Sequence, residues 1–174
     1  GAASLQMRDV DDTVKGAITF LNSDNSLRIR GHNNADRIII NSNGILTKPA
    51  HPMLSMTVDS SLLSGNYMTH NSVLTNNGNH YNTSTSKFVC PVAGFYYASI
   101  MVMSNNSNTT MDLELHKNSS NANNILVPYQ AATGGQYNQV SGSCIIQCSA
   151  NDILQFKLNS GSVYDGRHSN ITFA

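Results

Sequence analysis

The sequence carries little charge. Ten Lys and Arg residues balance ten Asp and Glu residues over 174 positions, so the formal net charge is zero and charged residues amount to 11%. An ordinary soluble domain has about 25% charged residues. A neutral chain has no long-range attraction for nucleic acid or for an acidic membrane surface. We therefore expect no nucleic-acid partner.

Long apolar runs and amphipathic helices are also missing. A membrane-spanning helix needs about 20 mostly apolar residues in succession, and no such run occurs, so we expect no membrane insertion. No stretch keeps apolar residues at the i, i+3, i+4, i+7 spacing of a helix face. Asn, Ser, Thr and Gly, which oppose helix interiors, occur throughout the chain.

Short alternating segments separated by turn residues fill the chain instead. In residues 111–115, for example, Met111, Leu113 and Leu115 alternate with polar residues. This pattern predicts an all-β sandwich or barrel. We expect strands at 18–20, 27–29, 38–40, 53–58, 73–74, 87–90, 94–103, 111–115, 125–127, 137–148, 153–158 and 171–173.

The chain divides into two parts of different composition. Residues 1–48 hold a few short β segments and little bulky apolar content, so they cannot bury a core alone. We expect this part to pair with copies of itself in an oligomer. The segment 47–52, TKPAHP, contains two prolines and predicts a stiff linker. The second domain is then residues 49–174.

Cysteine is scarce, and its three positions are Cys90, Cys144 and Cys148. An odd number argues against a closed disulfide framework. On one strand Cys144 and Cys148 would lie about 13 Å apart, at roughly 3.3 Å per residue, which is beyond the reach of a disulfide. We expect buried free thiols.

Nothing in the sequence favours catalysis or a metal site. A histidine beside Cys90 or Cys144 could serve as the base of a nucleophile pair, but no local signature supports this for His80, His116 or His168. Cys144 and Cys148 lack the clustered spacing of zinc ligands. We expect no catalytic residue and no metal, and hence a protein that is not an enzyme.

Residues 78–97 read GNHYNTSTSKFVCPVAGFYY and closely resemble the C1q globular-head family. Ser86 stands where the family usually has Gly. Further similar segments follow in order, namely LELHKN (113–118), YNQVSGSCIIQCSANDILQFKL (137–158) and RHSNITF (167–173), so the resemblance covers residues 51–174. The positions that match in the first segment are Gly78, Asn79, Tyr81, Ser84, Thr85, Lys87, Phe88, Cys90, Pro91, Gly94, Tyr96 and Tyr97.

This resemblance implies a ten-stranded jelly roll that assembles as a homotrimer, like the tumour necrosis factor cytokines. Alternation places one of Tyr96 and Tyr97 outward, and outward aromatics line the threefold interface in the trimeric family. The aromatic residues that we expect in the core or at the trimer interface are Phe88, Phe95, Tyr96, Tyr97, Tyr137, Phe156 and Phe173.

The first part of the chain carries a second resemblance. Residues 35–46, ADRIIINSNGIL, are similar to a segment common in bacteriophage tail fibres, and residues 44–56, GILTKPAHPMLSM, look like the start of C1q-like tips in fibres of marine phages. No Gly-X-Y collagen repeat precedes the head. The resemblance implies a β-rich fibre connector over residues 1–48 that binds other virion proteins, and a location on the virion exterior.

Calcium is a possible but disfavoured cofactor. Some C1q-like trimers bind calcium near the apex through acidic ligands, and Gln130 and Asn138 stand at those positions. A hard cation prefers carboxylates to amides, so we expect no cofactor. Asp165, which precedes Gly166, is expected to form a turn rather than to hold a metal.

Three segments rich in Asn, Ser, Gly and Thr are candidates for receptor binding. If the last strand ends beside the linker, residues 104–109, 130–136 and 159–167 lie together at the opposite end of the domain. Loops on a rigid scaffold often carry binding, although these segments could equally be solvated loops only. The residues that we expect to contact a receptor are Asn105, Asn106, Asn108, Gln130, Thr133, Gln136, Tyr164, Asp165 and Arg167.

Three functions fit the sequence. The leading hypothesis is a non-enzymatic, homotrimeric phage tail-fibre protein whose C1q-like tip binds a host-surface receptor, favoured to be a glycan. The first alternative is a virion structural protein, such as a capsid decoration, head fibre or tail collar, that binds other virion proteins. The second alternative is a secreted eukaryotic C1q-like lectin or ligand.

Overall fold

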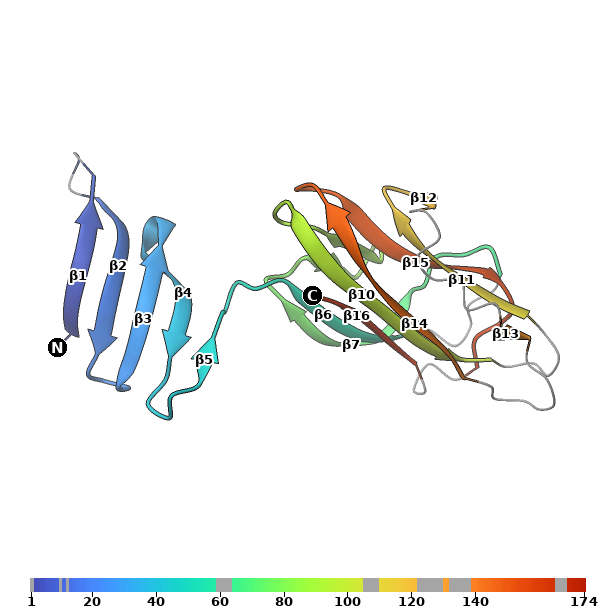
Figure 1. The fold of residues 1–174 in the computed structure, drawn as a ribbon, viewed down its shortest axis with the longest axis horizontal. Coiled ribbons are helices and arrows are strands. Elements are labelled where there is room, and N and C mark those ends of the chain that lie inside the picture. Colours follow the sequence, from blue (N-terminus) through green and yellow to red (C-terminus); the bar gives the residue numbers. More distant parts are fainter. Residues whose placement is uncertain are drawn as a thin grey trace. The chain divides into compact units, whose positions relative to one another are not determined.

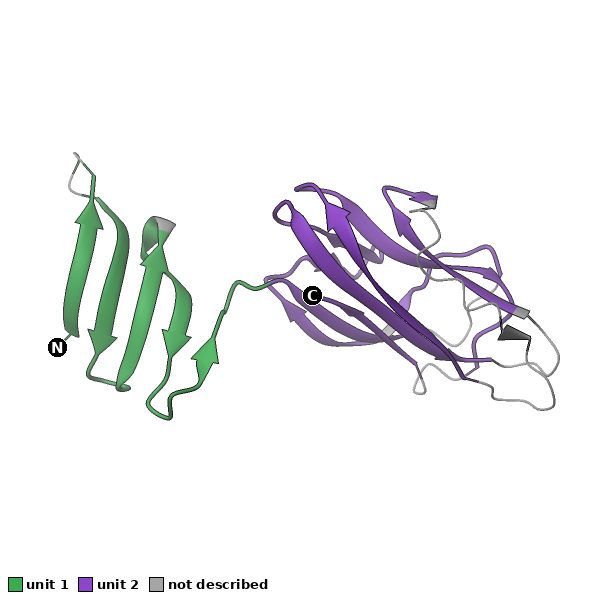
Figure 2. Cartoon of the chain, in the orientation of Figure 1, with its two compact units in different colours: residues 1–51 green, residues 52–174 purple. Residues whose placement is uncertain are grey.

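The structure, a computed structural model, describes residues 2–9, 11, 13–58, 64–104, 110–121, 130–131, 139–164 and 169–174. It contains two compact units, residues 1–51 and residues 52–174 (Figure 2). We call them the N-terminal unit and the C-terminal unit. The division falls within the proline-containing segment 47–52.

The N-terminal unit is one antiparallel meander (Figure 1). Asn25 and Gly44 adopt positive φ angles of 52° and 79° at turns of this meander, a conformation that Asn and Gly tolerate best. A 3-10 segment, His32–Asn34, joins the third and fourth strands. The strands, adjacent in chain order, are β1 (Ala2–Arg8), β2 (Val14–Leu21), β3 (Ser26–Gly31), β4 (Ala35–Ile40) and β5 (Leu46–Thr47).

The N-terminal unit does not enclose a hydrophobic core. The buried residues among those described in it are small or polar, namely Gly16, Ala17, Thr19 and Ser26. Its larger apolar side chains, such as Leu5, Ile18 and Phe20, are exposed. The described residues of this unit therefore form a single layer.

The C-terminal unit is a sandwich of two antiparallel sheets (Figure 1). The first sheet has the order β14-β10-β16-β6-β7, formed by β6 (Met53–Val58), β7 (His70–Asn77), β10 (Gly94–Met103), β14 (Gln139–Cys148) and β16 (Asn170–Phe173). The second sheet has the order β12-β11-β15-β9-β8, with β13 also paired to β11. Its strands are β8 (Tyr81–Asn82), β9 (Lys87–Val89), β11 (Thr110–Lys117), β12 (Ser120–Asn121), β13 (Gln130–Ala131) and β15 (Ile153–Ser160).

The core of this sandwich lies between the two sheets and is filled by alternating side chains. In β10 the buried side chains are Tyr96, Ala98, Ile100 and Val102, and in β11 they include Met111, Leu113 and Leu115. The ring of Phe173 on β16 stacks on Phe88 at 5.0 Å between centroids and on Phe156 at 5.4 Å. These rings join the two sheets, because Phe88 and Phe156 belong to the second sheet.

The predicted all-β class and the predicted strands at 94–103 and 111–115 are confirmed, and side chains alternate between buried and more exposed positions along both segments. The alternation of apolar and polar residues in the sequence does not predict β1, β5, β8, β12 or β13. The expected strand at 125–127 lies outside the described residues, and the one expected at 137–148 is described from Gln139 onward.

His116 continues the polar positions of β11 after Asp112 and Glu114, and the alternation of the sequence predicts that these three side chains share one face of the strand. The His116 side chain is only 6% exposed. Tyr67 packs edge-on against the ring with centroids 5.3 Å apart, and its hydroxyl lies 3.2 Å from Nδ1. Glu114 Oε2 lies 2.8 Å from Nε2 on the other side. The contact with Glu114 agrees with a shared face, and His116 is buried there because Tyr67, distant in sequence, covers this position.

Candidate functional site

The outward face of the first sheet carries an exposed apolar patch where β10 and β14 pair. Phe95, Tyr97 and Ile145 are 74%, 43% and 69% exposed. The register places Tyr97 directly opposite Ile145, and Phe95 is two residues before Tyr97 on the same face. We call these three residues the sheet patch. Contiguous exposed aromatic and aliphatic surface is typical of protein interaction sites.

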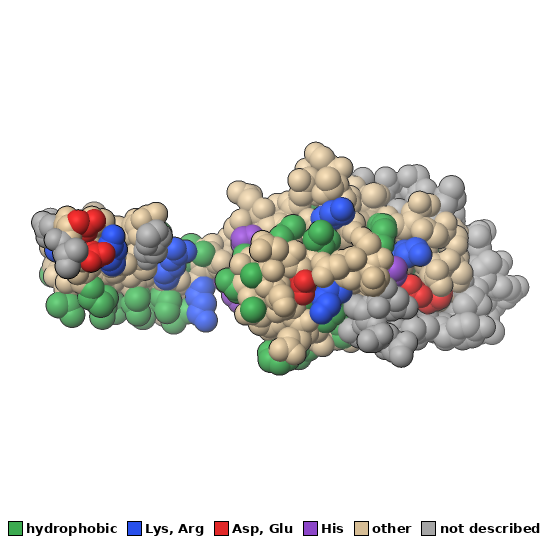
Figure 3. Space-filling view, turned by 90° about the horizontal axis from the view of Figure 1, so that it is seen from above, with side chains coloured by type: hydrophobic (Ala, Val, Ile, Leu, Met, Phe, Trp, Pro, Cys, Tyr) green, Lys and Arg blue, Asp and Glu red, His purple; other side chains and the backbone are tan. Residues whose placement is uncertain are grey.

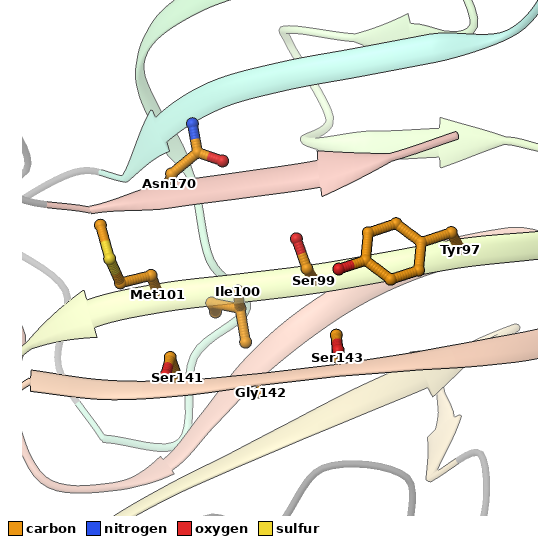
Figure 4. A pocket seen from close by; sticks show the side chains of 8 residues that line it. All are labelled: Tyr97, Ser99, Ile100, Met101, Ser141, Gly142, Ser143 and Asn170. Atoms are coloured by element: carbon orange, nitrogen blue, oxygen red, sulfur yellow. The ribbon is translucent and has the colours of Figure 1, made fainter.

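A shallow groove of about 260 Å³ continues from this patch along β10, β14 and β16 (Figure 4). It forms because small residues face each other across the strands. Ser99 lies opposite Ser143. The groove is lined by Tyr97, Ser99, Ile100, Met101, Ser141, Gly142, Ser143 and Asn170.

The groove offers hydroxyl and amide groups but no charge. The Asn170 amide is already engaged, since its Nδ2 donates to Ser55 Oγ at 3.1 Å and its Oδ1 accepts from Thr172 Oγ1 at 2.9 Å. The remaining serine hydroxyls can donate or accept a hydrogen bond. This chemistry suits a neutral polar segment, and it provides neither a nucleophile–base pair nor an acidic cluster.

The predicted core and interface aromatics separate into two groups. Phe88, Tyr96, Phe156 and Phe173 are buried in the core, and the Tyr96 hydroxyl is satisfied because it donates to the Val92 carbonyl at 2.8 Å. Phe95 and Tyr97 point outward in the sheet patch. Tyr137 lies outside the described residues.

The structure brings two of the predicted receptor-contact positions to the ends of segment 104–110. Gln130 begins β13 and is paired with Met111 at the start of β11. The Tyr164 backbone N–H donates to the Met103 carbonyl at the end of β10, at 2.7 Å. Asn138, one of the two calcium positions, lies outside the described residues. The same holds for the other predicted receptor contacts, namely Asn105, Asn106, Asn108, Thr133, Gln136, Asp165 and Arg167.

The three cysteines are free thiols in the C-terminal unit. Cys90 and Cys148 are buried and Cys144 is half-buried. Burial raises the pKa of the Cys90 thiol, and its neighbour Cys148 raises it further. Burial also raises the pKa of Cys148, and raises that of Cys144 to about 11. The thiolate is the reactive form, so these thiols are held in the unreactive state.

We expect at most one thiol to react in the folded protein at pH 8. Because its pKa is raised, each thiol keeps its proton at this pH, and Cys90 and Cys148 are also inaccessible. Half-buried Cys144 should be the first thiol to react with a maleimide, and it should react slowly. Mass spectrometry after maleimide treatment should show no more than one label natively and three in denaturant. Rapid native labelling of Cys90 would contradict this picture.

No group of three His, Cys, Asp or Glu side chains able to hold a metal occurs in the part of the chain that the structure describes. Among the described side chains, Asp112 Oδ1 is buried without a hydrogen-bond partner, although Oδ2 accepts from Asn159 Nδ2 at 2.8 Å. The described residues also contain no helix long and apolar enough to cross a membrane.

A family model for the C1q domain matches residues 54–174. The chain belongs to the C1q domain family. The C1q domain thus coincides with the C-terminal unit and its two-sheet sandwich, and the predicted C1q/TNF-like jelly roll is confirmed.

Two solved structures show the same fold. The globular domain of a zebrafish complement 1qA protein superposes with a TM-score of 0.53 at 18% identity, over 71% of this chain and 94% of that chain. The Eiger TNF of S. frugiperda gives a TM-score of 0.52 at 13% identity, over 70% of this chain and 90% of that chain. C1q/TNF-like domains are typically binding modules rather than enzymes.

Sequence reasoning missed the groove and the Tyr67–His116 contact. The groove depends on which serine of β14 lies opposite Ser99 of β10, and register between strands far apart in sequence is not visible in either segment alone. A signal was present, since small polar residues alternate in 139–147 at Ser141 and Ser143.

Proposed function

We propose that this chain is a non-enzymatic, homotrimeric binding protein of the phage tail-fibre type, whose C1q domain forms the receptor-binding tip. The observation that carries the proposal is the sheet patch, Phe95, Tyr97 and Ile145. It gives a C1q domain a large uncovered apolar surface, which copies of the same domain can cover around a threefold axis. C1q and TNF homologues are trimeric and bind receptors.

The oligomeric state tests the first half of the proposal. Light scattering of the purified chain at micromolar concentration should give three times the chain mass of 18.8 kDa. A measured mass of 18.8 kDa would contradict the proposed trimer and therefore also the proposed multivalent tip.

We propose that the receptor binds at the end of the domain where Gln130 and Tyr164 lie beside the ends of segment 104–110, and the backbone pairing of these two residues supports this position. Trimerisation presents three copies of this end, so weak contacts with a surface glycan add through effective concentration. Purified trimer should compete with intact phage for adsorption to host cells. Tyr164→Ala should weaken that competition by about tenfold if Tyr164 is a hot-spot contact.

The N-terminal unit supports a second candidate, a virion structural protein. Its sheet leaves apolar residues such as Leu5 and Phe20 exposed, and such a surface suits assembly rather than recognition of a soluble ligand. A trimer that fails to block adsorption, yet binds isolated capsid or tail particles, would favour this role. A secreted eukaryotic C1q-like ligand is equally compatible with the fold. Binding to animal cell surfaces with no binding to bacterial cells would favour it.

A further inference from the structure

The sheet of the N-terminal unit has one continuous apolar face. Leu5, Ile18 and Ile29 lie opposite one another across β1, β2 and β3, and Phe20 lies opposite Leu27 in the neighbouring row. Partners in register share a face of the sheet. Leu5 is 68% exposed and Met7, on the same face of β1, is 56% exposed. We call Leu5, Met7, Ile18, Phe20, Leu27 and Ile29 the apolar face.

The opposite face of the same sheet is charged and internally satisfied. Arg28 forms ion pairs with Asp24 and Asp36, and Arg30 Nε donates to Asp36 Oδ1 at 2.8 Å. The pKa of the Asp24 carboxyl is lowered by its hydrogen bond with Ser26 and by Arg28. Figure 3 shows the hydrophobic side chains in a row along one side of this unit and most of its charged side chains gathered on the other.

This two-faced sheet requires a covering layer on its apolar side. A sheet with one apolar and one polar face is stable when the apolar face packs on a second layer. The described residues of the N-terminal unit supply none, because its buried side chains are small or polar. An uncovered row of this length is also a template for aggregation.

We propose that the apolar face is covered by the same face of two other copies of this chain, so that three N-terminal sheets enclose a shared hydrophobic core. This inference rests on the trimer proposed above. The trimer tethers three identical apolar faces at a millimolar effective concentration. The six side chains of the apolar face are uncharged, so they do not repel their counterparts in another copy, and a symmetric assembly buries all three faces at once.

Two neighbouring residues of β1 provide a matched test. Leu5 and Ser4 are both exposed in a single copy but lie on opposite faces. In the full chain, we expect Leu5→Cys to react with a maleimide at least about tenfold more slowly than Ser4→Cys, because Leu5 lies in the shared core. The native thiols are buried or half-buried, so each new thiol can be followed by peptide mass spectrometry. Equal rates would overturn the inference.

The identity of the covering layer is tested by dissociating the trimer. In a Tyr97→Asp/Ile145→Asp background that light scattering shows to be monomeric, labelling of Leu5→Cys should rise to the rate of Ser4→Cys. If Leu5→Cys stays slow in that monomer, the cover is not another copy and the inference is wrong. A monomeric parent chain refutes the proposed trimer, whereas a trimeric parent with equal rates refutes only the shared core.

A charge on the apolar face gives an independent measurement. Leu5→Asp should accelerate hydrogen exchange in β1 to β4 by at least about tenfold within the intact trimer, because a carboxylate is then buried in an apolar core. Ser4→Asp, the control, should change exchange by less than about twofold. If both variants exchange like the parent, Leu5 is solvent-exposed in the assembly and the inference fails.

Discussion

Phe173→Ala is expected to destabilise the C1q domain by about 3–5 kcal/mol, the usual loss when a buried Phe becomes Ala. Phe173 is 1% exposed and its ring lies between Phe88 and Phe156, which come from β9 and β15 of the other sheet. The substitution would therefore leave a cavity at the point where the two sheets contact each other through these rings. Native domains are stable by only about 5–15 kcal/mol, so this loss is a large share of the total.

The backbone around Phe173 leaves little room for relaxation. Tyr97 N–H donates to the Ala174 carbonyl at 2.7 Å, and Ala174 N–H donates back to the Tyr97 carbonyl at 3.0 Å. The end of β16 is thus tied to β10, and on its other side Phe173 is in register with Leu54 of β6. A strand held on both sides cannot move inward to fill the cavity, which places the expected loss in the upper half of the range.

Urea denaturation at one fixed protein concentration measures this effect, because an oligomer's stability depends on concentration. Thr172→Ala is the control. It lies next to Phe173 on the half-exposed side of β16, where its hydroxyl donates to Asn170 Oδ1 at 2.9 Å, and it should cost about 1 kcal/mol or less. Similar midpoints for Phe173→Ala and Thr172→Ala would show that the aromatic stack does not hold the sheets together.

The features that sequence predicted are those encoded within single strands. The period-2 alternation of residues 94–103 predicts the bounds of β10 and places Tyr96, Ala98 and Ile100 on one face, because successive side chains of a strand face opposite sides. The structure shows that this is the buried face. The family motif around Cys90 and Pro91 adds the jelly roll, which alternation alone cannot distinguish from other sandwiches.

The features that escaped prediction depend on pairing between distant segments. The sequence of β1, AASLQMR, contains no β-branched residue that would predict a strand. It forms a strand because its backbone pairs with β2 from Ala2 to Arg8. Strands of two residues such as β8 and β12 are defined by their partners rather than by their composition. The burial of His116 likewise depends on Tyr67, which no local pattern reveals.

The double substitution Tyr97→Asp/Ile145→Asp is expected to convert the proposed trimer into monomers at micromolar concentration. The two side chains are in register across β10 and β14 and both are exposed in one copy, so the fold of the single domain should tolerate the change. In the proposed trimer the sheet patch is covered. The two new carboxylates of each copy, six in all, would then be buried away from water. Each buried, unpaired charge costs several kcal/mol, and about 1.4 kcal/mol already changes an association constant tenfold.

Light scattering measures the mass, and far-ultraviolet circular dichroism verifies that the fold survives. Val92→Asp is the matched control, because Val92 is another exposed apolar residue, 59% accessible, but lies in the connection between β9 and β10 rather than in the sheet patch. It should leave the mass at three times 18.8 kDa. If the double variant keeps the trimer mass, the sheet patch is not what holds the copies together. The copies would then associate through another surface, of which the apolar face of the N-terminal unit is the first to test.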